Sequence, residues 1–174
     1  RELQKRAREY LQHTWQSKQG VNATDVIADL PPSLRREIMF SLIRKLFMKS
    51  AVFADVSPTI LKGLAAFVKL TYYAPGDDVI RVGDAAHHVY FVWKGLLGVY
   101  LENGLKVGEI KQYAMFGEAA LVRDSPRGAT VTAAEFTELF ELNKKDFASV
   151  FRGFKDEFEE IQDILEEEIE NKDR

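Results

Sequence analysis

The segment FGEAALVRDSPRGATVTA, residues 116–133, holds residue types that could bind an anion. Gly117 lets the backbone turn and approach a ligand closely, and the residues after it can begin a helical turn whose amide N–H groups face outward. Arg127 follows Pro126 at the mouth of a β-rich stretch, and its guanidinium offers a fork of donors that matches two phosphate oxygens. Glu118 could accept hydrogen bonds from sugar hydroxyls, or pair with Arg127 when the site is empty. Together these residues predict an anion site.

Small side chains in this segment would leave room for a ligand between the loop and the neighbouring strands. They belong to Ala119, Ala120, Gly128 and Ala129. Each signal is weak alone, because a Pro-Arg pair before a strand is more often a turn with a solvated arginine. The combination is stronger, since a plain connection between two strands needs only a few residues.

The chain around this loop alternates between helical and β periodicities. A helix is predicted over 57–68, with Ser57 as its cap and Pro58 in its first turn. Tight glycine turns separate short segments rich in Val, Phe and Tyr, which favours an antiparallel roll or sandwich. These segments are at about 68–73, 79–82, 89–93, 96–101, 105–110, 129–134 and 136–142. The helical period returns after Asn143, so the expected class is α+β: a jelly-roll-like β-roll over about 68–142 and C-terminal helices over about 144–170.

Residues 1–50 show helical patterns and no strand pattern. One amphipathic helix is predicted over 2–18, and a second is predicted to be capped by Ser33. The apolar side expected for the second helix comprises Leu34, Ile38, Leu42, Ile43 and Leu46. Such a small helical array has little core of its own, so its apolar stripes need a partner in this chain or in another subunit. Because the chain starts inside a helix and without Met, we expect it to be a piece of a longer protein.

Composition argues against several classes of function. The 174 residues include no cysteine, which excludes disulfides and thiolate metal sites. His87 and His88 are adjacent and would point to opposite faces of a strand, and His13 is distant, so the histidines make a poor metal set. No Ser/His/Asp arrangement has the context of a catalytic motif. We therefore expect neither enzymatic activity nor a metal or cofactor.

Charge is distributed unevenly along the chain. The net charge is -3, but residues 155–174 alone carry -7, which leaves +4 on the rest. The basic residues of the first 50 positions are dispersed through amphipathic patterns rather than gathered on one face, so we expect no nucleic-acid partner. No stretch approaches the roughly 18 apolar residues that a membrane span requires.

From residue 51 to about 170, the chain resembles cyclic nucleotide-binding domains. The motifs that carry this resemblance occur in the family's order: SPTILKGL, YYAPGDDVIRVGD, HHVYFVWKGLLGVY, FGEAALVRDSPRGATV and FTELFELNKKDF. Residues 1–50, with REYLQHTW and LPPSLRREIMFSLIRKLF, resemble the C-linker of hyperpolarisation-activated, cyclic nucleotide-gated and related potassium channels. The resemblance implies a partial helical C-linker over 1–50 and a cyclic nucleotide-binding domain over 51–174, whose last helix is a lid.

The same resemblance implies roles for individual residues. Arg127 would pair with the cyclic phosphate, and Glu118 would take the ribose 2'-hydroxyl. The backbones of Gly117 and Ala120 would help to hold sugar and phosphate. The remaining expected ligand-binding residues are Ala119, Gly128 and Ala129 in the loop, and Val99, Gly108 and Ile110 on strands around the base.

Two positions bear on the choice between cAMP and cGMP. Family members that prefer cGMP use a threonine hydroxyl after the phosphate arginine, whereas this chain has Gly128, which favours cAMP. Hyperpolarisation-activated channels place a basic residue of the lid over the purine, whereas an ungapped count reaches Glu168 here. Channels that prefer cGMP use an acidic residue nearby, so Glu168 argues for cGMP whereas Gly128 argues for cAMP. Of the two nucleotides, we expect cAMP to be favoured.

The functional expectation is a regulatory domain on the cytoplasmic side of a membrane that binds cAMP or cGMP and couples this to gating of a tetrameric cation channel. Its partners would be the nucleotide, the neighbouring subunits of a homotetramer and the transmembrane domain of the same chain. Two alternatives stay open: the same module in a sperm-type sodium/proton exchanger, and a soluble cyclic-nucleotide receptor.

Overall fold

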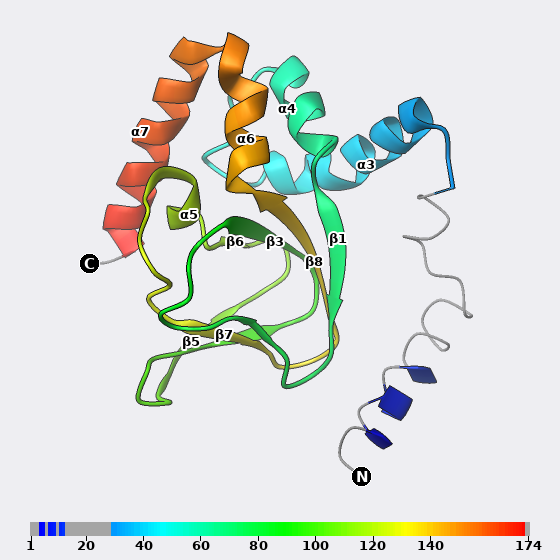
Figure 1. Ribbon diagram of the computed structural model, residues 1–174, viewed down its shortest axis with the longest axis vertical. Coiled ribbons are helices and arrows are strands. Elements are labelled where there is room, and N and C mark those ends of the chain that lie inside the picture. Colours follow the sequence, from blue (N-terminus) through cyan, green and yellow to red (C-terminus); the bar gives the residue numbers. More distant parts are fainter. Residues whose placement is uncertain (1–3, 6, 10, 13–28, 173–174) are drawn as a thin grey trace.

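The computed structural model describes residues 4–5, 7–9, 11–12 and 29–172 (Figure 1). Its first described residues are helical, whereas the other residues of the helix predicted over 2–18 lie outside the described part. The helices that follow are α3 (Pro32–Phe47), α4 (Pro58–Ala65), α5 (Ala119–Val122), α6 (Lys144–Val150), the 3-10 helix η1 (Phe151–Gly153) and α7 (Lys155–Lys172). The strands are β1 (Lys69–Tyr73), β2 (Asp78–Ile80), β3 (His88–Lys94), β4 (Leu97–Tyr100), β5 (Lys106–Ile110), β6 (Met115–Phe116), β7 (Thr130–Ala133) and β8 (Thr137–Asn143).

Two antiparallel sheets of four strands form the β-roll. The first sheet has the order β1-β8-β3-β6, and the second has the order β2-β7-β4-β5. Apolar side chains of both sheets meet in the interior of the roll, where they form one cluster. Its buried members are Tyr90, Val92, Leu97, Phe116, Val131 and Leu139. The expected α+β class with a β-roll is thereby confirmed.

The first sheet buries its other face against the helices. Along β3, Val89 and Phe91 belong to the helix-side cluster, whereas Tyr90 and Val92 face the roll interior, because successive strand side chains point to opposite faces. Phe53 lies within 6.4 Å of the ring centres of three other buried phenylalanines, which join α3 and α6 to β3. These three are Phe47, Phe91 and Phe147. Figure 1 shows α3, α4, α6 and α7 gathered at one end of the roll, with α7 running back alongside α5.

Of the two helix caps predicted at Ser57 and Ser33, the structure confirms the first. The hydroxyl of Ser57 accepts the amide of Ile60 at 3.5 Å at the start of α4. Asn143 caps α6 by accepting the amide of Lys145 at 2.8 Å. The prediction that Ser33 caps α3 is wrong: the helix starts at Pro32, whose fixed φ suits a first helical position, so Ser33 already lies in the first turn.

The apolar face of α3 also differs from the expected one. Leu34 is 43% exposed, while the buried residues of α3 are Met39, Ile43, Leu46 and Phe47. The C-terminal half of α3 is the part that packs against α4 and the central phenylalanines, so burial follows that contact and not the whole stripe. Because α3 shares this core, the hydrophobic packing does not change at residue 50. The division of the chain into a linker and a domain at that position stays a prediction.

Candidate functional site

A cavity of about 250 Å³ lies between the second sheet, the loop over 116–129 and the end of α7. Most of the predicted site residues line it: Gly117, Glu118, Ala119, Arg127, Gly128, Ala129, Val99 and Ile110. Two predicted residues do not. Ala120 is fully buried behind the loop, and its amide donates to the carbonyl oxygen of Gly117 at 3.2 Å. Gly108 pairs with Val99 in the sheet but lies outside the lining.

Arg127 is buried in the wall of this cavity, with 7% of its surface exposed. Its Nη1 donates to the carbonyl oxygen of Gly117 at 3.1 Å, and its Nη2 donates to that of His88 at 2.6 Å. Burial lowers the pKa of the guanidinium, while Tyr90 and Glu118 oppose that shift, and an arginine pKa is so high that the group stays charged. The structure therefore holds a fixed, buried cation rather than the solvated arginine of an ordinary turn.

The backbone of Arg127 is fixed as firmly as its side chain. Its amide donates to the carbonyl oxygen of Asp84 at 2.8 Å, and its own carbonyl accepts the amide of Gly83 at 2.8 Å. These two hydrogen bonds attach the cavity loop to the turn that follows β2.

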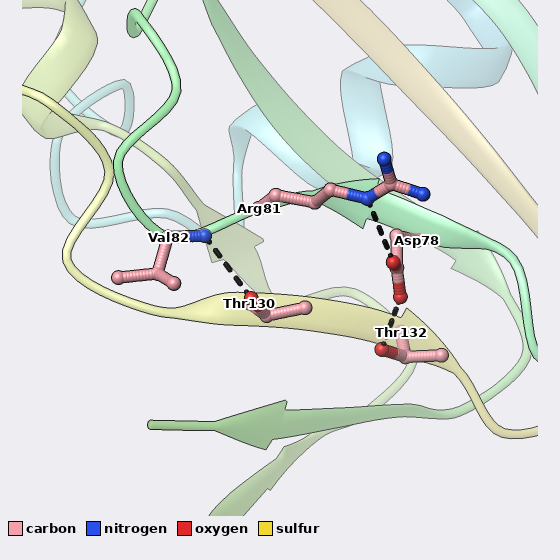
Figure 2. Close-up of polar contacts among 5 residues, drawn as sticks. All are labelled: Asp78, Arg81, Val82, Thr130 and Thr132. Carbon is pink, nitrogen blue, oxygen red and sulfur yellow. Dashed lines mark hydrogen bonds and ion pairs between the residues drawn. The ribbon is translucent and has the colours of Figure 1, made fainter. Parts of the chain in front are cut away.

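Further hydrogen bonds beside that turn join the region of β2 to β7, as Figure 2 shows. The amide of Val82 donates to the hydroxyl of Thr130 at 3.0 Å. The carboxylate of Asp78 on β2 accepts the hydroxyl of Thr132 at 2.7 Å and Nε of Arg81 at 2.9 Å. The hydrogen bonds from Thr132 and then from Arg81 lower the pKa of Asp78, so the carboxylate stays ionised at neutral pH. Strand β2 is thus joined to β7 directly after Arg127.

Gly117 is needed where the loop passes Arg127. Its φ of 75° lies in the left-handed region, and a Cβ at this position would be 2.6 Å from Nη1 of Arg127. The predicted helical turn after it is confirmed as α5, which begins at Ala119. The loop therefore approaches the guanidinium as closely as it does only because residue 117 has no side chain.

Glu118 is paired with a residue that no motif had marked. Its carboxylate forms an ion pair with Nζ of Lys172, at the end of α7, and not with Arg127 as one sequence-based alternative proposed. Arg127 instead points its nitrogens at backbone carbonyls. Among the residues that line the cavity, the charged side chains are Arg127, Lys172 and Glu118, and their formal charges sum to +1.

Helix α7 closes one side of the cavity. Ile169 and Lys172 line it, and Nε of Arg123, just after α5, donates to Oε2 of Glu166 at 2.8 Å. Glu168, which the ungapped count placed over the base, is not among the lining residues. The residues of α7 that do line the cavity are Ile169 and Lys172, in the last turn of the helix.

The cavity also has an apolar wall. Besides the predicted Val99 and Ile110, it contains Ile80, Phe116 and Val131 from three other strands. Val131 and Phe116 could have been found from strand alternation, because both point into the roll. Ala86, Ser125 and Pro126 complete the lining beside the loop. This wall offers an apolar surface to a ligand in the cavity.

The described part of the chain gives no support for a metal site or for a membrane-spanning helix. There, no group of three or more His, Asp and Glu side chains is arranged to hold a metal ion. Within the same residues, no helix combines the length and the apolar character needed to cross a bilayer.

Comparison with known proteins identifies the domain. Residues 70–153 match the family model of the cyclic nucleotide-binding domain, and this part of the chain is a domain of that family. The match covers the β-roll, the loop and α6. Because this family is a regulatory binding domain and its channel relatives use it as such, the expectation that the chain is not an enzyme is confirmed.

The relatives are ion channels. The chain is 29% identical to the voltage-gated inwardly rectifying potassium channel KCNH6 of Rattus norvegicus over 161 residues, 90% of this chain and 17% of the relative. It is 27% identical to a cyclic nucleotide-gated channel of Caenorhabditis elegans over 163 residues, 90% of this chain and 22% of the relative. It is 25% identical to the cyclic nucleotide-gated channel rod photoreceptor subunit alpha of Gallus gallus, again over 90% of this chain, and spans 25% of that relative. The chain thus spans a quarter or less of these relatives.

Proposed function

We propose that the chain binds a cyclic nucleotide in the cavity between the loop over 116–129 and α7, and that binding regulates a cation channel. The observation that carries this proposal is the buried, ionised Arg127 in a cavity that also has an apolar wall. The two carbonyl contacts use two of the five N–H donors of the guanidinium, so the group keeps donors for a phosphate.

Charge and shape agree with this ligand. A cyclic phosphate diester carries one negative charge, which matches the formal charge of +1 among the lining side chains. The buried carboxylate of Glu118 can accept a sugar hydroxyl, and Val99, Ile110 and Val131 can pack on a base. Proposed ligand contacts are therefore the eight predicted residues of the lining together with Ile169.

We propose cAMP as the preferred nucleotide. Gly128 has no hydroxyl to offer a guanine, and the hydroxyl of Thr130 already accepts the amide of Val82. The acidic lid residue Glu168, which had argued for cGMP, lies outside the lining. The proposed preference for cAMP over cGMP therefore rests on Gly128.

Channel regulation is supported by the relatives named above, each of which is an ion channel. In this proposal the domain lies on the cytoplasmic side of the membrane in a homotetramer, and α3 passes the movement of α7 toward the pore through the core that both helices share. A ligand shifts such an equilibrium only by its preference for one state, and coupling of about 1–3 kcal/mol is typical.

Calorimetric titration of the chain with cAMP, cGMP, 5'-AMP and adenosine tests the proposal. We expect saturable binding of cAMP, weaker binding of cGMP, and much weaker binding of the two compounds that lack a cyclic phosphate. A folded chain that binds neither cyclic nucleotide would overturn the proposed function. Tighter binding of cGMP than of cAMP would overturn only the preference.

A further inference from the structure

The ion pair between Glu118 and Lys172 occupies the carboxylate that the proposed function assigns to the sugar. The side chain of Glu118 is 8% exposed, so its carboxylate is largely cut off from water and depends on a partner within the cavity. Lys172 supplies that partner from the opposite side, and its own side chain is 55% exposed at the cavity mouth. The lysine can therefore leave for solvent, whereas the carboxylate cannot.

A sugar hydroxyl and a lysine ammonium would compete for the same acceptor. Both donate hydrogen bonds to a carboxylate, and the ammonium adds charge. The cavity has about 250 Å³ for a ligand, and the ion pair lies across its lining between the loop and α7. A nucleotide that reaches Glu118 must take over at least part of the bond that Lys172 holds.

We infer that Lys172 is an affinity-determining residue of this site, which competes with the sugar hydroxyl of the nucleotide for Glu118. This inference rests on the proposed function. Binding then exchanges an ion pair within the chain for a hydrogen bond to the ligand, and Lys172 weakens binding although it is a cation in the wall of an anion site.

A second contact holds α7 in place during that exchange. Arg123 and Glu166 join the end of α5 to α7 two turns before Lys172. Because Ile161, Leu165 and Ile169 stay buried along the same helix, release of Lys172 frees the last turn without detaching the lid. The competition is local to Glu118.

The test compares Lys172→Met with Lys155→Met. Both remove one positive charge from α7, but Lys155 is the exposed first residue of the helix and does not line the cavity. Titrations with cAMP and with 2'-deoxy-cAMP measure affinity. We expect Lys172→Met to tighten cAMP binding by about threefold to tenfold, in the range of a partly exposed ion pair, and Lys155→Met to change it little. The preference for cAMP over the 2'-deoxy compound should grow in Lys172→Met, because Glu118 is then free for the hydroxyl.

Weaker cAMP binding in Lys172→Met than in Lys155→Met would overturn the inference, since it would make Lys172 a ligand contact and not a competitor. An unchanged preference for the 2'-hydroxyl would overturn it as well.

A measurement without nucleotide separates this inference from the proposed function. Hydrogen exchange of amides 169–172, the last turn of α7, is compared in the unchanged chain, Lys172→Met, Glu118→Gln and the double variant. We expect each single change to speed exchange and the double variant to add nothing further, because both changes remove the same ion pair. Additive effects would overturn the inference whether or not nucleotide binds. If the effects on exchange are non-additive but the chain binds no nucleotide, the proposed function is overturned. The ion pair then exists, but no nucleotide competes with Lys172 for Glu118.

Discussion

Nη2 of Arg127 donates to the carbonyl oxygen of His88 across 2.6 Å, and this bond joins the loop of the second sheet to the first residue of β3 in the first sheet. The guanidinium is thus held by the two sheets before any ligand arrives. A group that is fixed in advance loses little conformational freedom on binding, which is the physical basis of tight recognition.

Gly117 should be required for both stability and binding. We expect Gly117→Ala to lower the free energy of unfolding by about 1–2 kcal/mol, because its φ of 75° is strained for alanine. It should also weaken cAMP binding, because the new Cβ would lie 2.6 Å from Nη1 of Arg127 and displace it. Denaturant unfolding and calorimetric titration measure the two effects.

Gly104→Ala is the matched control for that change. Gly104 has a similar φ of 80°, but a Cβ there meets no atom within 4 Å. It should lose similar stability and keep its affinity. Equal losses of affinity in the two variants would show that displacement of Arg127 is not the cause.

Residue 128 should control the choice of nucleotide. Because a Cβ at Gly128 meets open space, Gly128→Thr is expected to fold and to add a hydroxyl near the base. We expect the affinity for cGMP relative to cAMP to rise about fivefold, which corresponds to one net hydrogen bond of about 1 kcal/mol. Titration of Gly128→Val, which has a similar shape without the hydroxyl, should show no such rise; a rise in both variants would contradict the hydrogen-bond explanation.

The contact between Arg123 and Glu166 should hold α7 over the cavity. With both side chains more than a third exposed, the contact is worth about 0.2–1 kcal/mol. We therefore expect Arg123→Gln to speed hydrogen exchange in α7 by about twofold to fivefold at low salt, and less at high salt because ions screen the pair. Arg152→Gln, an exposed change on η1, serves as the control. Exchange that does not respond to Arg123→Gln at either salt concentration would argue against this role.

Asp78 should make the stability of the chain depend on pH in the acidic range. The pKa of Asp78 is lowered in the folded state, first by the hydrogen bond from Thr132 and then by that from Arg81. The ionised carboxylate therefore contributes to the free energy of unfolding above the unfolded pKa of about 3.9, and this contribution is lost as the pH falls through the lower folded pKa. Denaturant unfolding of Asp78→Asn should differ most from the unchanged chain at neutral pH, and the difference should shrink below about pH 4. A difference that grows on acidification would contradict the assignment.

Local sequence signals were sufficient for much of this structure. All seven predicted β segments correspond to strands, because alternating apolar residues and glycine turns mark them directly. Strand β6 was missed because Met115–Phe116 is too short to show a period. The short helix after Gly117 and the cap at Ser57 were likewise readable from neighbouring residues.

Contacts between residues that are far apart in the sequence could not be predicted from local patterns. Lys172 is 54 residues from Glu118 and belongs to no motif, so only the packing of α7 against the loop reveals the ion pair. The ungapped count to Glu168 did not reach a lining residue, because the sequence alone does not show how α7 packs against the loop; the lining residues of α7 are Ile169 and Lys172. The cap predicted at Ser33 failed because a proline one residue earlier already starts the helix.

Calorimetric titration of Arg127→Gln and Arg127→Lys with cAMP tests the central claim most directly, with Arg152→Gln as a charge-matched control. We expect Arg127→Gln to lose at least about tenfold in affinity, because a charged hydrogen-bond donor to the phosphate is removed, and Arg127→Lys to recover part of the loss. Cooperative unfolding of each variant establishes that the fold is retained. Unchanged cAMP affinity in folded Arg127→Gln would contradict the account, because the cavity would then not be the site at which the phosphate binds.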